Sequence, residues 1–274
     1  MATKQRSKRR ARPDKAAAPA PKRRRPGLGA IGAGVAGLAA LAAIVLAVLF
    51  SLGVVGGDDS AASQADKKLK AGQPVTAEDL ADSIQASWKT SFAAETKTWA
   101  PAAVAAAHTG DDPCQAPVAV YCDTNRTVYL EPEFMDRVRT RAGMQAQLAE
   151  AFVVAHLIGH HVQHELGITD KAEKGEKLHP DKAAKIGKAR ELEADCLAGF
   201  GLRGLVEEGV ISTQGIERAM TAAGETGQAL ATDDPTDFNQ ETWHSTALKN
   251  RVKWFERGLR VPDVGACDTF AGLV

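Results

Sequence analysis

The spacing of apolar residues predicts a helix after residue 76. From residue 80 to residue 92 an apolar side chain stands at every fourth position, which forms one stripe along a helix. Thr76 lies just before this stripe, and Asp79 follows three positions later, the arrangement of a capping box. We therefore expect a helix that begins after Thr76 and packs through its apolar stripe.

Shorter apolar runs predict a small sheet. The runs VAVYC, at residues 118–122, and TVYL, at residues 127–130, flank the polar sequence DTNR, which favours a β-hairpin. We expect a further strand at residues 102–107. An edge strand of such a sheet could pair with an extended peptide backbone, or the hairpin could serve the fold alone.

Most of the chain beyond Pro132 has a helical pattern, interrupted by polar segments. We expect the charged residues 171–180 to form a surface loop, and residues 232–240 to form an acidic loop. The fold class is therefore α+β, a mainly helical domain at residues 76–274 with a small β-sheet or hairpin. The expected helices cover residues 133–141, 149–166, 181–208, a segment that follows Ser212 as its N-cap, and residues 245–260.

Charge is divided unevenly between the start of the chain and the rest. Residues 1–26 contain eleven Lys and Arg and one acid, although the formal net charge of all 274 residues is zero. The remaining chain is therefore acidic overall. Residues 1–26 cannot form a core, so we expect a disordered basic tail. Its basic runs could bind nucleic acid, but the next segment favours a membrane interpretation, and we expect no nucleic-acid partner.

Residues 27–57 contain no charged side chain. A transmembrane helix needs about 20 such residues. The positive charges before this segment, with Asp58 and Asp59 after it, predict a cytoplasmic N-terminus and an extracytoplasmic C-terminal domain. A cleaved signal peptide is the alternative, but its apolar part would be only about 7–15 residues long. We therefore expect a single-pass anchor in the cell membrane, followed by a polar linker at residues 58–75.

All four cysteines lie in the part of the chain that we expect outside the cytoplasm. They are Cys114, Cys122, Cys196 and Cys267. An even number of cysteines there is typical of disulfides, and three pairings are possible. Zinc ligation is the alternative, although the sequence has no Cys-x-x-Cys pair.

The segment AEAFVVAHLIGHHVQHELG, at residues 149–167, carries the candidate chemistry. His156 and His160 stand four positions apart on one helical face, so both can reach one metal ion. The spacing is that of the His-Glu-x-x-His motif of zinc peptidases, but Leu157 occupies the glutamate position. His164 lies about 12 Å along the axis from His156, too far to bind the same ion in an unbroken helix. We expect it at the surface or behind a ligand.

A third ligand is expected in RELEADC, at residues 190–196, because catalytic zinc usually takes three protein ligands and leaves one position open. Glu191 and Asp195 share one helical face there. One carboxylate could bind the metal while the other accepts a hydrogen bond from the far nitrogen of a ligating histidine. The alternative is an ordinary solvated acidic face.

Together these motifs resemble the bacterial neutral zinc metallopeptidases, a family whose members are usually membrane-anchored or secreted. The resemblance covers roughly residues 88–270 and is carried by several separate blocks in the same order. The blocks are VYCDTNRTVYLEPEF (120–134), AHLIGHHVQHELG (155–167), ELEADCLAG (191–199), RVKWFERGL (251–259) and ACDTF (266–270).

The resemblance implies a zincin-like domain of the gluzincin type that binds Zn²⁺ and takes a peptide or protein as substrate or ligand. It implies that His156, His160 and Glu191 ligate the zinc, and that Asp195 contacts a ligating histidine from behind. It also implies the disulfide pairs Cys114 with Cys122 and Cys196 with Cys267.

The departure from the family pattern lies at Leu157. The family glutamate at this position acts as a general base, and leucine can neither accept nor donate a proton. Glu165 points about 180° around the helix from the metal-binding face and cannot replace it. Glu150 and Glu193 cannot be placed from the sequence. Loss of a positioned acid–base group typically costs about 10²–10⁴ in rate.

Two other histidines are candidates for roles near the site. His244 stands before the last helix, where the family shows a histidine-containing loop. It could stabilise a tetrahedral oxyanion, or it could cap and pack the start of that helix. His161 is expected to pack against a neighbouring helix.

Two functions follow from these residues. With Leu157 in place of the base, we favour an extracytoplasmic zinc-binding domain that is impaired or inactive as a peptidase and binds a peptide or protein. The alternative is an active zinc peptidase that uses a substitute base. Neither the substrate nor the oligomeric state follows from the sequence.

Overall fold

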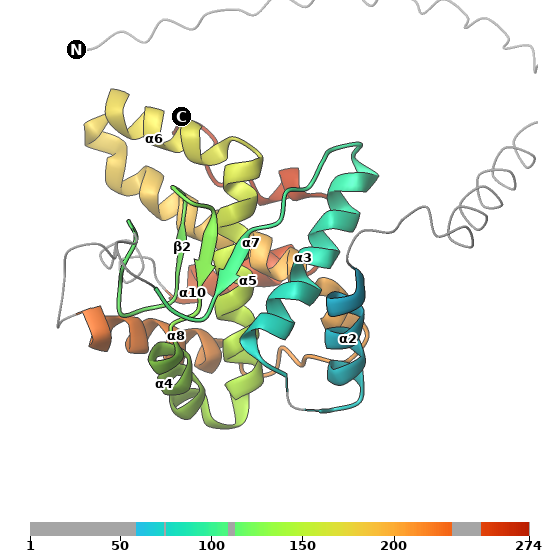
Figure 1. The fold of residues 1–274 in the computed structure, drawn as a ribbon. Coiled ribbons are helices and arrows are strands. Elements are labelled where there is room, and N and C mark those ends of the chain that lie inside the picture. Colours follow the sequence, from blue (N-terminus) through green and yellow to red (C-terminus); the bar gives the residue numbers. More distant parts are fainter. Residues whose placement is uncertain (1–58, 74, 109–112, 232–247, 274) are drawn as a thin grey trace, which may run out of the picture. The chain divides into compact units, whose positions relative to one another are not determined.

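The computed structural model describes residues 59–73, 75–108, 113–231 and 248–273 (Figure 1). The basic tail, the predicted anchor at residues 27–57, the predicted loop at residues 232–240 and His244 lie outside these residues. In the described part of the chain, no helix combines the length and the apolar character needed to cross a membrane.

Helices make up most of the described chain, and a small sheet lies beside them (Figure 1). The helices are α2 (Asp59–Lys70), α3 (Ala77–Ala94), α4 (Pro132–Ala142), α5 (Ala146–Glu165), α6 (Ile168–Leu178), α7 (Ala183–Glu207), α8 (Ile216–Ala231) and α10 (Leu248–Gly258). The strands are β1 (Ala103–Ala105), β2 (Val120–Cys122) and β3 (Thr127–Tyr129). Short 3-10 turns cover Gly143–Gln145, Pro180–Lys182 and Val264–Cys267. The predicted α+β class is confirmed.

Helix α3 begins at the predicted capping box. The Thr76 hydroxyl accepts a hydrogen bond from the Asp79 amide at 3.1 Å, and the Asp79 carboxylate accepts one from the Thr76 amide at 3.0 Å. The whole apolar stripe of this helix is buried. Within it, the Trp88 ring stacks on Phe200 of α7 with 5.2 Å between ring centroids. The stripe thus fastens α3 to the helix that carries the acidic motif.

The sheet has the strand order β1-β3-β2. Strands β2 and β3 form the predicted antiparallel hairpin, and β1 pairs with β3 in parallel. All three strands are shorter than the predicted runs. Because β3 is central, β2 is an edge strand among the described residues, and it contacts α5.

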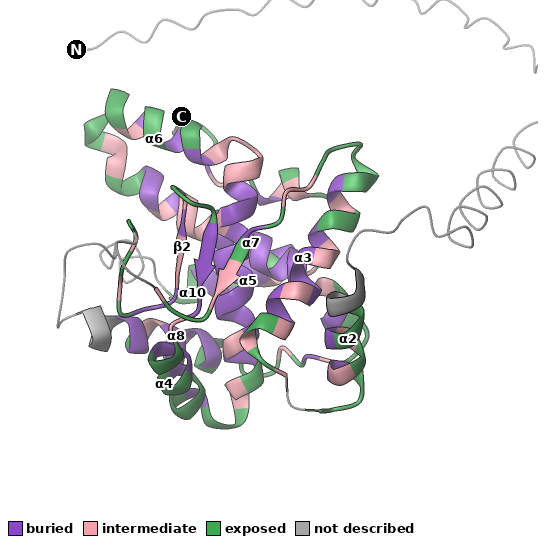
Figure 2. Ribbon diagram, viewed as in Figure 1, coloured by how far each residue is buried: buried purple, intermediate pink, exposed green. Residues whose placement is uncertain are grey.

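Helices α5 and α7 form the centre of the fold. Figure 2 shows both as mostly buried, and α5 contacts α3, α4, α7, α8 and strand β2. A helix that is buried on most sides, as α5 is, is stable only when other elements surround it. Helix α10 also packs very closely on α7. A Cβ atom added at Gly258 would lie 1.9 Å from the carbonyl oxygen of Cys196, so this crossing requires glycine.

Two segments that we expected to be irregular are helices instead. Residues 59–70, within the expected linker, form α2, whose Ala65 and Leu69 are buried against α3. A Lys68–Asp79 ion pair at 2.9 Å adds to that contact. Residues 168–178 form α6, which includes most of the surface loop expected at residues 171–180. Only one narrow side of α6 is buried, around Ala172, so its apolar periodicity is weak in the sequence.

The start of α8 also differs from the prediction. The helix begins at Ile216 rather than directly after Ser212. The Ser212 hydroxyl instead accepts a hydrogen bond from the Gln214 amide at 3.2 Å, which is a local turn before the helix.

Both disulfides implied by the family resemblance are present. Cys114 bonds Cys122 and ties the loop before β2 to that strand. Cys196 bonds Cys267 across 71 residues and holds the C-terminal segment against α7. No free cysteine remains among the described residues, so zinc ligation by cysteine is excluded for them.

Candidate metal centre

The site forms where α5 and α7 cross, and Gly159 allows the two helices to approach each other. A Cβ atom at residue 159 would lie 2.8 Å from the Ala194 carbonyl oxygen, closer than real Cβ contacts allow. Gly159 lies between the two histidines of α5, and Ala194 lies between the two acids of α7. Because Gly159 has no side chain, the two histidines of α5 can approach Glu191 and Asp195 of α7.

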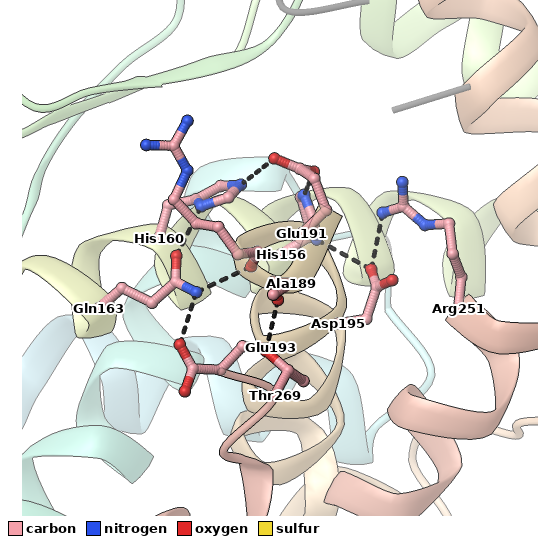
Figure 3. Close-up of polar contacts among 10 residues, drawn as sticks. His156, His160, Gln163, Ala189, Glu191, Glu193, Asp195, Arg251 and Thr269 are labelled. Carbon is pink, nitrogen blue, oxygen red and sulfur yellow. Dashed lines mark hydrogen bonds and ion pairs between the residues drawn. The ribbon is translucent and has the colours of Figure 1, made fainter. Parts of the chain in front are cut away.

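His156, His160 and Glu191 point toward one another at this crossing (Figure 3). Nε2 of His156 lies 3.3 Å from one carboxylate oxygen of Glu191, and Nε2 of His160 lies 3.5 Å from the other. One ligand atom from each of the three residues can be chosen so that all lie within 4.8 Å of one another. The structure thus brings together the three residues predicted as ligands.

Asp195 lies behind His156, as predicted. Its Oδ1 atom is 3.0 Å from Nδ1 of His156, on the side of the ring opposite Glu191. The same oxygen accepts a hydrogen bond from Arg251 of α10 at 2.7 Å (Figure 3). All three side chains are almost completely buried. Sequence reasoning missed Arg251, because its role depends on how α10 packs on α7.

Gln163 contacts Nδ1 of His160, just as Asp195 contacts Nδ1 of His156. Sequence reasoning missed this role of Gln163. Nδ1 of His160 lies 2.9 Å from Oε1 of Gln163. The Gln163 amide nitrogen donates to the Arg190 carbonyl at 2.8 Å and to the Glu193 carboxylate at 2.9 Å (Figure 3). Because an amide oxygen accepts, Nδ1 of His160 carries the proton and Nε2 is left to bind a metal. The sequence signal for this contact is that Gln163 follows His160 by three positions, which makes the two side chains neighbours on a helix.

The electrostatics of the site hold Glu191 ionised. Burial raises the pKa of its carboxyl, but the charge of His160 and the hydrogen bond from His156 outweigh burial, so the pKa lies well below its usual range. Burial also opposes protonation of His156, yet hydrogen bonds to Asp195 and Glu191 leave its pKa raised. The ionised carboxylate is the form that binds a divalent cation, and such a cation would displace the proton that the raised pKa of His156 favours.

These donors fit zinc. Two imidazole nitrogens and one carboxylate are a common ligand set of catalytic zinc. Zinc–nitrogen bonds of about 2.0–2.1 Å in a tetrahedron require neighbouring ligand atoms to be about 3.3–3.4 Å apart. The 3.3 and 3.5 Å distances from the histidines to Glu191 are close to that value.

A cavity of about 200 Å³ opens beside the three residues. Its walls come from β2, α4, α5, α7, α8 and the start of α6, and they are mostly apolar. Leu157 is one of the lining residues and is 7% exposed. The position at which the sequence resemblance implies a glutamate base therefore presents a hydrocarbon side chain to the cavity.

The other candidate residues of α5 do not reach the metal centre. His164 is partly exposed and lies 2.8 Å from Asp123, in agreement with the predicted surface position. His161 is fully buried, but it contacts the Tyr121 hydroxyl and the Ala100 carbonyl rather than a neighbouring helix. That part of the prediction is wrong, because the sheet and the segment before it cover this face of α5.

The three carboxylates considered as substitute bases in the sequence have other partners. Glu150 accepts hydrogen bonds from Arg139 at 3.0 and 2.6 Å, and Glu165 lies 3.8 Å from Arg126. Glu193 is buried beside Gln163. Burial raises the pKa of its carboxyl to about 7. Its hydrogen bond from Gln163 places it behind His160, away from Leu157.

Comparison with known proteins agrees with the geometry. A family model described as "Putative neutral zinc metallopeptidase" matches residues 4–270. "Uncharacterized protein YpfJ" of Escherichia coli strain K12 is 31% identical over 156 residues, which are 55% of this chain and 53% of that protein. "Uncharacterized protein Rv2575" of Mycobacterium tuberculosis strain H37Rv is 33% identical over 176 residues, or 60% and 59%. The chain thus spans between half and three fifths of these relatives. No solved structure matches.

Proposed function

Because the chain belongs to the neutral zinc metallopeptidase family, we propose that it is a zinc-binding, peptide-binding domain whose hydrolytic activity is impaired or lost. We assign the zinc to Nε2 of His156, Nε2 of His160 and the carboxylate of Glu191. Two ligands from one helix and a glutamate from a second helix correspond to the gluzincin type of zincin site. When bound, zinc polarises a carbonyl group and lowers the pKa of a water molecule.

The protein residues around the site support tight zinc binding. Asp195 and Gln163 each hold the far nitrogen of one ligating histidine, at 3.0 and 2.9 Å. Such contacts fix the tautomer and the orientation of the ring. Burial of the ligands excludes competing water from all but the cavity side.

The observation that carries the proposal is the side chain of Leu157. A peptidase needs a group that takes a proton from the attacking water and passes it to the leaving amine. The Leu157 side chain lines the cavity at the family position for that group, and it cannot hold a proton. Binding of a peptide needs no such group, so the site keeps its ligands and its cavity while losing the proton transfer.

The alternative, an active peptidase, requires a substitute base. Among the described residues that line the cavity, Asp123 is the one carboxylate besides the ligand Glu191. It lies at the end of β2 and is held 2.8 Å from His164. If the wild-type protein cleaves peptides, we expect Asp123 to act as the base and Asp123→Asn to abolish the cleavage.

A peptide is the ligand that the walls of the cavity suit best. Val120 and Tyr121 of β2 line it, and β2 is an edge strand among the described residues. An edge strand offers backbone groups to an extended peptide, and the apolar walls offer space for a side chain. The cavity is below the usual 300–1,000 Å³ of small-molecule sites, roughly the space of one or two residues.

We also propose that the domain lies outside the cytoplasm and is attached to the membrane by residues 27–57. The uncharged character of that segment and the basic residues before it support this orientation. The two disulfides support an oxidising compartment.

Zinc analysis of the full-length chain, purified in detergent, tests the metal assignment. We expect about one zinc per chain, and little in His160→Ala, because structural zinc sites need their full ligand set. His164→Ala is the matched control on the same helix and should retain the metal. Less than about half an equivalent in metal-replete wild type would refute the ligand assignment.

A further inference from the structure

Arg190 places a positive charge in the wall of the cavity. It belongs to α7, directly precedes the ligand Glu191, and lines the same cavity as His160 and Leu157. The main chain of Arg190 is held close to the metal ligands. The side-chain amide of Gln163, which contacts His160, also donates to the Arg190 carbonyl at 2.8 Å. The backbone of Arg190 is therefore a fixed neighbour of the metal centre, and its side chain lines the cavity.

Within the described part of the chain, Arg190 differs from the other arginines in that its guanidinium has no hydrogen-bond or ion-pair partner. Each of the others lies within bonding distance of a carboxylate or a backbone carbonyl. For Arg190, the structure places no hydrogen-bond partner at the buried Nε atom within the described residues. A guanidinium donor that is buried without a partner costs free energy, which a ligand can recover.

The charges around the cavity indicate the sign of that ligand. The two carboxylates of the wall already have partners: Glu191 faces His156 and His160, and Asp123 faces His164. Zinc would add two positive charges against the single negative charge of Glu191. With zinc bound, the metal and Arg190 would contribute three positive charges against the two negative charges of Glu191 and Asp123. The cavity would then carry an excess of positive charge, and Arg190 is the part of it that lies outside the metal centre.

We propose that Arg190 binds a carboxylate of the peptide ligand, so that the site selects peptides with an anionic group next to the metal-facing residue. A guanidinium binds a carboxylate through two parallel hydrogen bonds, which gives both affinity and orientation. The carboxylate comes from the C-terminus of a short peptide or from an acidic side chain. This assignment rests on the proposed peptide-binding function.

Fluorescence anisotropy with labelled peptides tests the assignment on the zinc-loaded full-length chain. The first pair of probes is tetra-alanine with a free C-terminal carboxylate and the same peptide as its amide. The second pair is Ala-Ala-Glu-Ala amide and Ala-Ala-Gln-Ala amide. We expect one acidic probe to bind about ten- to a hundredfold more tightly than its neutral counterpart. The pair that shows the difference identifies the source of the carboxylate.

Variants of Arg190 separate its contribution from direct binding of the carboxylate to zinc. Arg190→Gln should remove the preference for the acidic probe and leave the zinc content unchanged, and Arg190→Lys should restore part of the preference. Lys185→Gln is the matched control, because it removes one positive charge from an exposed position on the same helix. It should bind all probes as wild type does.

Two results would overturn the assignment. One is equal, measurable affinity for the acidic and the neutral probes in protein with full zinc content. The other is a preference for acidic probes that survives Arg190→Gln. Failure of the proposed function itself would look different, because the wild-type protein would then lack zinc, or the zinc-loaded protein would bind none of the probes.

Discussion

The Nδ1 atom of His156 lies 3.0 Å from Oδ1 of Asp195, and at most 3% of either side chain is exposed. The same oxygen accepts from Arg251 at 2.7 Å. A chain of contacts thus runs from α10 through α7 to the proposed metal ligand on α5. The orientation of His156 depends on three helices that lie far apart in the sequence.

Replacement of Asp195 by asparagine tests this contact. Asparagine keeps the shape of the side chain but removes the carboxylate that accepts the proton of His156. We expect zinc affinity to fall by about 10- to 100-fold, the usual effect of losing a partner behind a ligating histidine. Competition with a chromogenic chelator measures the affinity. Glu207→Gln, at an exposed position of the same helix, is the control and should change nothing. An unchanged affinity in Asp195→Asn would show that Asp195 does not orient the ligand.

Gly159→Ala tests whether the close approach of α5 and α7 forms the site. The new Cβ would lie 2.8 Å from the Ala194 carbonyl oxygen, which is backbone and cannot rotate away. We expect the helices to separate, zinc affinity to fall, and the free energy of unfolding to fall by about 1–3 kcal/mol.

Gly204→Ala is the matched control for the helix crossing. Gly204 is an exposed residue of α7, and a Cβ added there meets nothing within 4 Å. Alanine should therefore raise stability by about 0.5–1 kcal/mol through its better helix propensity. If both variants behave alike in urea unfolding and in zinc binding, the crossing does not control the site.

The helix faces could be read from the sequence because they depend on local spacing. The capping box at Thr76, the hairpin around Asn125, and the shared face of His156 and His160 each involve residues that are few positions apart. The family resemblance then supplied Glu191, which local spacing alone left as one of two candidates.

The remaining features depend on contacts between distant segments. Gln163 looks like any polar helix residue until α7 brings the Arg190 carbonyl and the Glu193 carboxylate to its amide nitrogen. The role of Arg251 likewise depends on its hydrogen bond to Asp195, which belongs to a distant segment of the chain. Helices α2 and α6 were missed because each buries very few apolar residues, so their patterns resemble those of polar loops.

The two disulfides should contribute unequally to stability. The Cys196–Cys267 bond closes a loop of 71 residues, whereas Cys114 and Cys122 are separated by 8. The longer loop restricts the unfolded chain more, so the entropic contribution is about 4 kcal/mol for the first bond and about 2.5 kcal/mol for the second. Urea unfolding of the two double alanine variants measures the difference. A larger loss for the short loop would contradict this reasoning.

The central claim is that the chain keeps a zinc site and lacks its base, and Leu157→Glu tests it most directly. Zinc content and casein cleavage are measured for wild type, Leu157→Glu and the neutral control Leu157→Gln. We expect equal zinc in all three and chelator-sensitive cleavage in Leu157→Glu alone, at least about 10² faster than in wild type. Wild-type cleavage as fast as that of Leu157→Glu, or an inert Leu157→Glu with full zinc, would contradict the claim.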